Sequence, residues 1–302
     1  MTSKKTKTSS FGSPGRSGHD ASSFYSGKLY DGITTKDDAQ YIENSIPSQY
    51  LDGIICGTAE NMKELSGDCV HLVVTSPPYN VGKDYDQDQT LDEYLAFLER
   101  IWLEVNRVLV PGGRLCINVA NLGRKPYLPI HALMIPGLLR NGFLMRGEVI
   151  WNKGSSAGTS TAWGSWMSAS NSTLRDVHEY ILIFSKDSFR RQNPDKRLST
   201  ISKEEFLEST RSVWNLPAVS ARKIGHPAPF PEEIPRRLIE LYTFNEEVIL
   251  DPFMGSGQTA LAAMKSGRHF IGYEIEPEYV DLARKRIQAF EEDAQNQEID
   301  HD

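Results

Sequence analysis

The stretch VILDPFMGSGQTALAA, residues 248–263, decides the fold. Its apolar first part ends at Asp251 and is typical of a buried strand, and Gly255 and Gly257 predict a tight turn into a helix of small residues. Glycines in such a turn let the backbone approach a ligand closely, and a helix N-terminus offers free N–H groups. The stretch therefore predicts a strand, a ligand-binding turn and a helix at the edge of an α/β sheet.

A carboxylate follows this turn at a spacing typical of nucleotide-binding α/β folds. The strand predicted in RHFIGYEI, residues 268–275, ends at Glu274, just under twenty residues past the glycines. A carboxylate there can accept hydrogen bonds from both hydroxyls of a ribose. A turn without a ligand is the structural alternative, and GSGQT lacks the lysine of a triphosphate-binding loop. Glu274 therefore favours a ligand that contains a ribose.

Two prolines stand directly behind another predicted strand. In HLVVTSPPYN, residues 71–80, the run LVV predicts an interior parallel strand, and Pro77 and Pro78 stop both the ladder and any helix. The chain must leave the sheet in a stiff turn that carries the Ser76 hydroxyl, backbone carbonyls and the Tyr79 ring. Ligands bind at the carboxyl ends of strands in open α/β sheets, so this turn is a candidate functional site.

The rest of the chain alternates between strand and helix patterns. Residues 90–109 have helical periodicity with one apolar face, formed by Leu91, Tyr94, Leu95, Leu98, Trp102 and Val105. Residues 131–143 predict a helix that is broken at Pro136, and strands are predicted at 144–153 and 178–186. This alternation indicates an α/β fold with a mainly parallel sheet.

Composition limits the class of protein. The 302 residues carry a formal net charge of −7, and no apolar run is long enough to span a membrane. Residues 1–28, without an apolar signal core, predict a disordered tail, and residues 291–302 predict an acidic disordered tail. The three cysteines have no disulfide or metal-site spacing, which fits a reducing cytoplasm and a protein without a metal site.

Together, TSPPYN and DPFMGSGQT resemble the signature segments of the DNA amino-methyltransferases that use S-adenosylmethionine. The resemblance extends over about residues 50–290 and includes VLVPGGRLCINV, HPAPFPEEIPRRLIELYT and IGYEIEPEYVDLARKRI. The catalytic segment precedes the cofactor segment, an order similar to that of the circularly permuted β group. The resemblance implies a Rossmann-like methyltransferase domain over residues 29–290, with a mainly parallel sheet and a target-recognition insert at about 154–225.

The resemblance gives Ser76, Pro77, Pro78 and Tyr79 the catalytic role. The exocyclic amines of cytosine and adenine are poor nucleophiles, because their lone pairs are conjugated with the ring. The Ser76 hydroxyl and the Pro77 carbonyl would accept hydrogen bonds from the two amino protons and so stabilise the developing positive charge. Tyr79 would stack on a target base that is flipped out of the duplex. As structural alternatives, Ser76 shapes a turn and Tyr79 packs in the core.

The resemblance also implies the cofactor-binding residues. Glu274 would hold the ribose of S-adenosylmethionine, and His226 would line the methionine end. Thr58 stands where many relatives have an aspartate that contacts the adenine, so its contact would be neutral. The remaining expected contacts surround the methionine part and are Asp251, Pro252, Phe253, Gly255, Ser256 and Gly257.

Basic and aromatic residues predict where DNA binds. Residues 151–230 hold eleven Lys and Arg against seven Asp and Glu, so this part is positive although the whole chain is acidic. A solvated loop and a tryptophan that caps the core are the structural alternatives. The expected DNA-binding residues are Trp163, Arg175, Arg190, Arg191, Lys196 and Arg197.

The resemblance implies site-specific methylation of double-stranded DNA. Family habit associates Ser-Pro-Pro-Tyr with cytosine N4 and Asp-Pro-Pro-Tyr with adenine N6, so cytosine N4 is expected and adenine N6 is the alternative. Methylation of cytosine C5 is disfavoured because no cysteine follows a proline. An RNA or protein methyltransferase and a catalytically silent DNA-binding protein are further alternatives. A prokaryotic, cytoplasmic protein is expected, while a homodimer and a cognate restriction endonuclease are left open.

Overall fold

The computed structural model describes residues 25–36, 40–78, 89–154, 166–225 and 229–299. Contacts between residues divide the chain into two units, residues 1–36 and 37–302. The described part of the first unit contains one short 3-10 helix, η1 (Lys28–Tyr30). All elements discussed below belong to the second unit.

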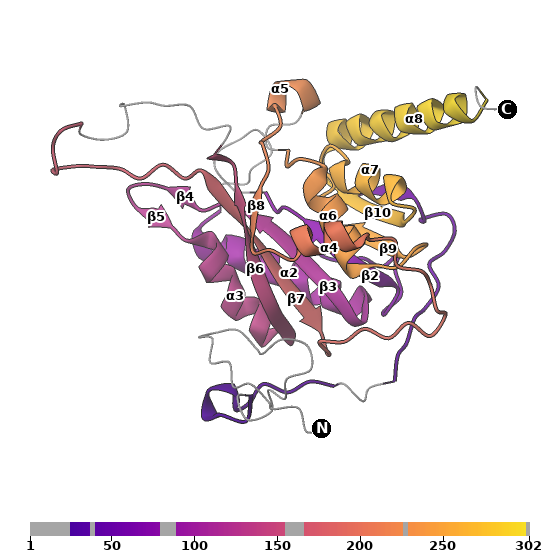
Figure 1. Cartoon of the computed structure of the whole chain (residues 1–302), viewed down its shortest axis with the longest axis horizontal. Coiled ribbons are helices and arrows are strands. Elements are labelled where there is room, and N and C mark those ends of the chain that lie inside the picture. The colour runs from indigo at the N-terminus through magenta and orange to yellow at the C-terminus, as the bar shows by residue number, and fades with distance from the viewer. Residues whose placement is uncertain (1–24, 37–39, 79–88, 155–165, 226–228, 300–302) are drawn as a thin grey trace, which may run out of the picture. The chain divides into compact units, whose positions relative to one another are not determined.

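An eight-stranded sheet forms the centre of this second unit (Figure 1). The strands lie in the order β1-β10-β9-β2-β3-β7-β6-β8, and β7 runs antiparallel to both of its neighbours while the other pairs are parallel. The expected α/β fold with a mainly parallel sheet is therefore confirmed. The strands are β1 (Gly53–Cys56), β2 (Val70–Thr75), β3 (Leu109–Val119), β6 (Phe143–Asn152), β7 (His178–Lys186), β8 (Val213–Asn215), β9 (Val248–Asp251) and β10 (His269–Glu274).

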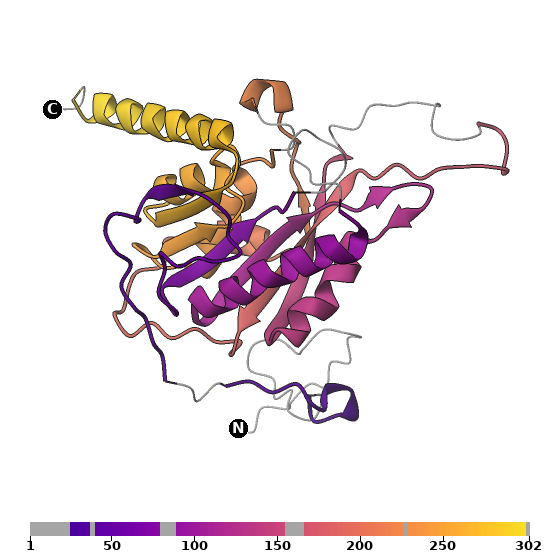
Figure 2. The same cartoon turned by 180° about the vertical axis from the view of Figure 1, so that it is seen from behind.

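Helices cover both faces of the sheet, and each face has its own apolar core. Figure 2 shows α2 (Leu91–Val108) and α3 (Ile130–Arg140) on one face, and Figure 1 shows α6 (Glu233–Tyr242) and α7 (Gln258–Lys265) on the other. The second core also takes side chains from α8 (Pro277–Ile299). The smaller elements are the β4 (Leu122–Gly123) and β5 (Tyr127–Leu128) hairpin, α4 (Lys203–Ser209) and α5 (Ala221–Ile224).

Helix α2 forms where the periodicity predicts it. Thr90 caps its N-terminus, because the side chain accepts from the Glu93 N–H while the Glu93 carboxylate accepts from the Thr90 N–H. The Thr90 hydroxyl also donates to the Glu93 carboxylate, and this bond, with the one from the Thr90 N–H, holds the pKa of Glu93 below its usual value. The helix buries one face against the sheet, with Tyr94, Leu98, Ile101, Trp102, Val105 and Val108.

Two expectations about helices are wrong. Helix α3 continues through Pro136 to Arg140, because Ile130, Met134 and Leu138 are buried on either side of the proline and packing offsets the missing hydrogen bond. Helix α8 continues to Ile299, so residues 291–299 are helical where a disordered tail was predicted. Glu, Ala and Gln favour a helix in that stretch, and a hydrogen bond from Gln288 to Glu292 spans one turn.

The predicted recognition insert, 154–225, is partly built into the sheet. It contains all of β7, which pairs with β3 and β6, and it contains β8 at the sheet edge. Residues 166–177, which lead into β7, hold no helix or strand apart from a single bridge residue. A target-recognition role therefore remains a prediction for this region, whose β7 also completes the core.

The parallel strands define two edges of the sheet. Their carboxyl ends lie along one edge, together with the start of the antiparallel β7, and are Cys56, Thr75, Val119, Asn152, Asn215, Asp251 and Glu274. We call this the carboxyl edge, and we call the opposite edge, where β2 and β9 begin, the amino edge. The predicted catalytic and cofactor segments both leave the sheet at the carboxyl edge.

Candidate active site

The segment after β2 is held in place at the carboxyl edge. Ser76 and Pro78 are half-buried and Pro77 is buried. The Tyr94 hydroxyl of α2 donates a 2.8 Å hydrogen bond to the Pro78 carbonyl, which fixes the loop from the side of the helix. Tyr79 lies outside the described residues. The sequence marks Tyr94 only as a core residue, because periodicity shows which face a side chain occupies but not what its hydroxyl reaches.

Asp251 joins the end of β2 to the glycine turn. It is 1% exposed, and its carboxylate accepts hydrogen bonds from the Thr75 hydroxyl at 2.6 Å and the Thr259 hydroxyl at 2.7 Å. The Phe253 N–H donates to the same carboxylate at 3.1 Å. Burial raises the pKa of Asp251 to about 6, although these hydrogen bonds act in the opposite direction. Asp251 therefore positions three segments of the site.

The glycine turn takes the backbone shape that the sequence predicts. Gly255 and Gly257 have φ values of +51° and +80°, in the left-handed region that favours glycine. A side chain at Gly257 would also approach the Cβ of Ala283 within 3.1 Å. Nearby, Gly272 of β10 makes room for Met254, a close approach that its position inside a strand does not reveal.

Glu274 lies beside the glycine turn at the end of β10. Its carboxylate accepts from the Gly255 N–H at 2.8 Å and from the Glu276 N–H at 3.0 Å. Burial raises the pKa of Glu274 above its usual value, against the lowering effect of these bonds. The Glu274 backbone carbonyl accepts a hydrogen bond from the Gly57 N–H. The next residue after Gly57 is Thr58, which is exposed. Glu274 and Thr58 are thus neighbours at the carboxyl edge.

The other expected cofactor residues occupy the same turn. Pro252 and Ser256 are buried, and the Ser256 carbonyl accepts a hydrogen bond from Arg286. The half-buried Phe253 ring meets Trp102 edge-on, with 6.5 Å between ring centroids. Gln258 donates to the Phe230 carbonyl at 2.8 Å and so ties the turn to the segment before α6. His226 lies outside the described residues.

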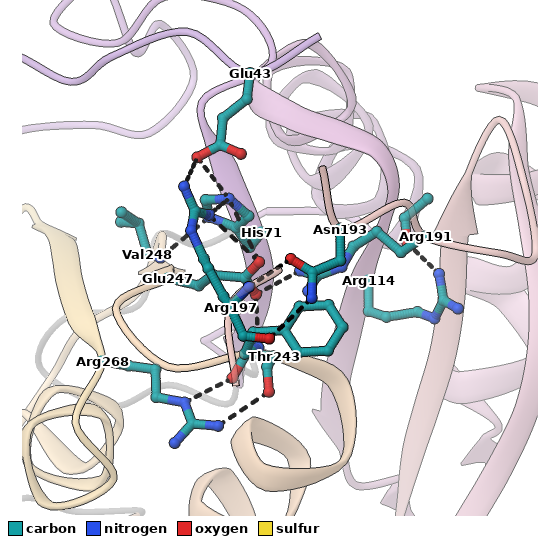
Figure 3. A network of polar contacts seen from close by, with 12 residues as sticks. Glu43, His71, Arg114, Arg191, Asn193, Arg197, Thr243, Glu247, Val248 and Arg268 are labelled. Carbon is teal, nitrogen blue, oxygen red and sulfur yellow. Dashed lines mark hydrogen bonds and ion pairs between the residues drawn. The ribbon is translucent and has the colours of Figure 1, made fainter. Parts of the chain in front are cut away.

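The basic cluster predicted to contact DNA lies near the amino edge and is divided between two environments. Arg190 and Lys196 are exposed. Arg191 is 8% exposed in its side chain and pairs with Glu247 at 2.6 Å. Arg197 donates to Glu43 at 2.7 Å and lies 3.5 Å from Glu247 (Figure 3).

A buried histidine completes this ion network. His71, at the start of β2, is 2% exposed, and its Nδ1 accepts from the Val248 N–H at 3.1 Å. Its Nε2 therefore carries a proton and lies 3.1 Å from Glu43 (Figure 3). The hydrogen bonds from His71 and Arg197 hold the pKa of Glu43 below its usual range, against burial. Arg191 and Arg197 thus neutralise acids inside the fold, which disfavours the predicted contact of these two with DNA phosphates.

The remaining predicted DNA contacts are placed only in part. Arg175 is exposed before β7, and Trp163 lies outside the described residues. Within the described ranges, no group of three His, Cys, Asp or Glu side chains is arranged to hold a metal ion. In the same ranges, every helix is too short or too polar to cross a membrane.

Sequence comparisons identify the family that this fold and site define. The model of a DNA methylase family, the N6/N4 methylases, matches residues 70–285. The type II methyltransferase M.MjaI of Methanocaldococcus jannaschii is 32% identical over 277 residues, covering 78% of this chain and 90% of that protein. The DNA adenine methyltransferase YhdJ of Escherichia coli is 27% identical and covers 78% of this chain and 82% of its own.

Solved structures agree with this result. The candidate DNA modification methylase TTHA0409 of Thermus thermophilus, in complex with S-adenosyl-L-methionine, is 31% identical with a TM-score of 0.62, covering 78% of this chain and 92% of its own. The cytosine-N4-specific PvuII DNA methyltransferase shares the fold at 19% identity and a TM-score of 0.62, over 76% of this chain and 84% of its own. The fold is that of a Rossmann-like methyltransferase. The chain belongs to the N6/N4 family of DNA methyltransferases, whose cofactor is S-adenosylmethionine.

The residues around the glycine turn fit this cofactor. The Glu274 carboxylate beside the turn would accept from the ribose hydroxyls, and the left-handed glycines would let the backbone come close to the methionine part. Both acids, Asp251 and Glu274, are more easily protonated in the folded chain than in water. The charge state of the site therefore changes with pH in a mildly acidic range.

We expect the affinity for S-adenosylmethionine to fall as the pH is lowered through about 6. Protonation of Asp251, whose pKa is about 6, weakens its hydrogen bond with Phe253 N–H, and protonation of Glu274 removes the charge that favours the ribose hydroxyls and the cationic cofactor. Calorimetric titrations at a series of pH values measure the change.

The raised pKa of Asp251 also affects the folding stability of the cofactor-free protein, and in the opposite direction to its effect on cofactor affinity. The folded chain holds a proton on Asp251 up to about pH 6, whereas the unfolded chain loses it at lower pH, so this group makes stability decline as pH rises through that window. The Glu274→Gln variant is the control for the affinity measurement, because it removes the part of the pH dependence that comes from Glu274. An affinity that stays constant from neutral pH to about 5 would contradict both assignments.

Proposed function

We propose that the chain is a site-specific methyltransferase that moves the methyl group of S-adenosylmethionine to N4 of cytosine in double-stranded DNA. The observation that carries the proposal is the position of Ser76 and Pro77 at the carboxyl edge, directly after Thr75, which is bonded to Asp251 of the cofactor segment. This brings two acceptors for an amine next to the glycine turn. The order of the two segments along the chain supports the permuted β group.

The proposed chemistry is a direct, in-line transfer. The Ser76 hydroxyl and the Pro77 carbonyl accept hydrogen bonds from the two amino N–H groups, so the nitrogen lone pair turns out of the ring plane toward the sulfonium methyl. The bond from nitrogen to the methyl carbon forms as the bond from that carbon to sulfur breaks, and the methylated amine then loses one proton to water. Pro78, bonded to Tyr94, keeps the two acceptors in register. Tyr79 stacks on the flipped base, and Glu274 and the glycine turn hold the cofactor.

The thiols support an amine as the target rather than a ring carbon. Methylation at cytosine C5 needs a thiolate nucleophile, and burial raises the pKa of Cys69 to about 11 and that of Cys116 further above its usual value. The third cysteine, Cys56, is exposed at the end of β1, which is separated from β2 by β10 and β9.

Cytosine N4 is preferred to adenine N6 because of Ser76, since family habit associates Ser-Pro-Pro-Tyr with cytosine. The DNA adenine methyltransferase YhdJ is similar over most of the chain, which supports adenine N6 as the second candidate. We further propose that residues 154–225 recognise the target sequence, with Arg175 and Trp163 as contacts, and that the exposed Arg190 and Lys196 contact DNA phosphates. The names and organisms of the type II relatives support a prokaryotic cytoplasm and a cognate restriction endonuclease as proposals, and a homodimer is a further proposal.

The product of the reaction tests the proposal. The purified chain is incubated with methyl-labelled cofactor and with duplex DNA, RNA or protein, and labelled DNA is digested to nucleosides for mass spectrometry. We expect label in duplex DNA and a product identical to N4-methylcytosine. N6-methyladenine would correct the base, 5-methylcytosine would overturn the mechanism, and label only in RNA or protein would overturn the substrate.

A further inference from the structure

Three polar side chains meet at the carboxyl edge beside the predicted acceptors. Asn118 of β3 donates from Nδ2 to Glu179 of β7 at 2.6 Å, and Lys153, which follows β6, donates to the other oxygen of Glu179 at 2.7 Å. Asn118 is 3% exposed, and the side chains of Glu179 and Lys153 are 13% and 24% exposed. We call these residues the edge cluster.

The edge cluster leaves one buried acceptor without a donor. A carboxylate can only accept, so Glu179 fixes the Asn118 amide with its N–H₂ toward Glu179 and its Oδ1 turned away. Among the residues that the structure describes, no donor reaches Asn118 Oδ1, although the atom is buried. Buried acceptors normally have a partner, so this oxygen indicates a missing contact.

The sheet register brings Asn118 beside Ser76. In the parallel pair of β2 and β3, Thr75 is the last residue of β2 and the partner of Ile117, so Asn118, the next residue of β3, stands opposite Ser76, the first residue after β2. Partner residues in a parallel pair point to the same face, so extension of this register by one residue puts the side chains of Ser76 and Asn118 on one side of the sheet. Ser76 is half-buried and Asn118 is buried at this position.

The proposed chemistry requires an acceptor at this position. Ser76 Oγ can accept an amino proton with a lone pair only if its own proton points elsewhere, and a hydroxyl proton directed at the amine would block the nitrogen lone pair. Asn118 Oδ1 is a neutral acceptor on the adjacent strand. Donation of Nδ2–H to the Glu179 carboxylate polarises the amide and makes Oδ1 a stronger acceptor.

We propose that Asn118 is a positioning residue for Ser76. Its Oδ1 accepts a hydrogen bond from the Ser76 hydroxyl when substrate binds, and Glu179 and Lys153 hold the amide in that orientation. The inference rests on the proposed methyl transfer to an exocyclic amine. It assigns Lys153 the additional role of balancing the charge of Glu179, so that the cluster presents an oriented but neutral acceptor to Ser76.

A double-mutant cycle tests the inference. Single-turnover methylation of duplex DNA with labelled cofactor is measured for the wild type, Asn118→Leu, Ser76→Ala and the double variant. We expect Asn118→Leu to slow transfer roughly tenfold when Ser76 is present and less than about twofold in the Ser76→Ala background, because the contact acts through the serine. The affinity for S-adenosylmethionine should be unchanged in all four proteins.

The controls separate positioning from structure. Lys153→Met changes the more exposed end of the edge cluster. It should slow transfer less than Asn118→Leu does, with the same dependence on Ser76, and it replaces Asn118→Leu in the cycle if that variant does not fold. Lys186→Met removes a comparable lysine that pairs with Asp68 at 2.7 Å at the other end of β7, and its effect should be equal in both backgrounds. Equal factors for Asn118→Leu and for Lys153→Met in both backgrounds would overturn this inference alone. A Ser76→Ala protein with the wild-type rate would overturn the proposed function as well.

Discussion

Replacement of Ser76 by alanine should slow methyl transfer by about 10²–10³, the usual effect of losing one contact that stabilises developing charge. The affinity for S-adenosylmethionine and for DNA should change little, because the amine becomes positive only as the methyl group arrives. Single-turnover rates on duplex DNA, with cofactor titrations by calorimetry, measure the two quantities separately. The residual activity would come from the Pro77 carbonyl and from the alignment of the reactants.

Ser185→Ala is the matched control for this experiment. Ser185 is a fully buried serine of β7 that stands opposite Arg114 of β3 in the sheet register, near the amino edge. Its replacement therefore tests the loss of a buried hydroxyl far from the acceptors. We expect the rate of this variant to match that of the wild type. A Ser76→Ala protein that loses cofactor affinity as much as rate would mean that Ser76 shapes the turn and does not accept from the amine.

The central parts of the site could be predicted from sequence because their signals are local. Ser76, Pro77 and Pro78 follow an apolar run, and Gly255 and Gly257 follow another, so neighbouring residues alone specify a strand end and a turn. A left-handed φ at both glycines agrees with this interpretation. The same holds for α2, where apolar spacing and the pair Thr90 and Glu93 define the helix and its start.

The contacts that fix the site could not be predicted, because they join residues far apart in the chain. Thr75 donates to Asp251 across 176 positions, and Asn118 donates to Glu179 across 61. In neither pair do the two residues belong to the same sequence motif. Each contact exists only because the strand order brings β2 beside β9 and β3 beside β7. Local spacing indicates the candidate reacting groups, while strand order determines which distant residues support them.

Charge counting has a related limit. Arg191 and Arg197 stand in a positive stretch, which favours a nucleic-acid surface when charge is judged from composition. Glu247, which pairs with Arg191, and Glu43, which pairs with Arg197, lie outside that stretch, so the sequence does not show that these charges cancel. The excess of positive charge available to DNA in residues 151–230 is therefore smaller than the count implies.

Replacement of Glu247 by alanine should lower the free energy of unfolding by about 3–5 kcal/mol, the usual cost of leaving a buried charge unpaired. Glu247 is 2% exposed, and its loss leaves Arg191 without its partner at 2.6 Å and removes the acceptor for the Phe244 N–H. Urea unfolding of the cofactor-free chain measures the change. At a temperature where the variant is folded, we expect the salt dependence of DNA binding to equal that of the wild type.

The exposed members of the basic cluster are the control, and they carry the remaining prediction of a phosphate contact. Arg190→Ala and Lys196→Ala should change the free energy of unfolding by less than about 0.5 kcal/mol, because both residues are exposed. If each contacts one phosphate, each variant lowers the slope of log affinity against log salt by about 0.9 without changing the preferred sequence. An unchanged slope would make these two residues part of a solvated loop. A reduced slope for folded Arg191→Met or Arg197→Met would instead show that the paired arginines leave Glu247 and Glu43 to reach DNA, because a residue that only stabilises the fold cannot alter the number of ions released.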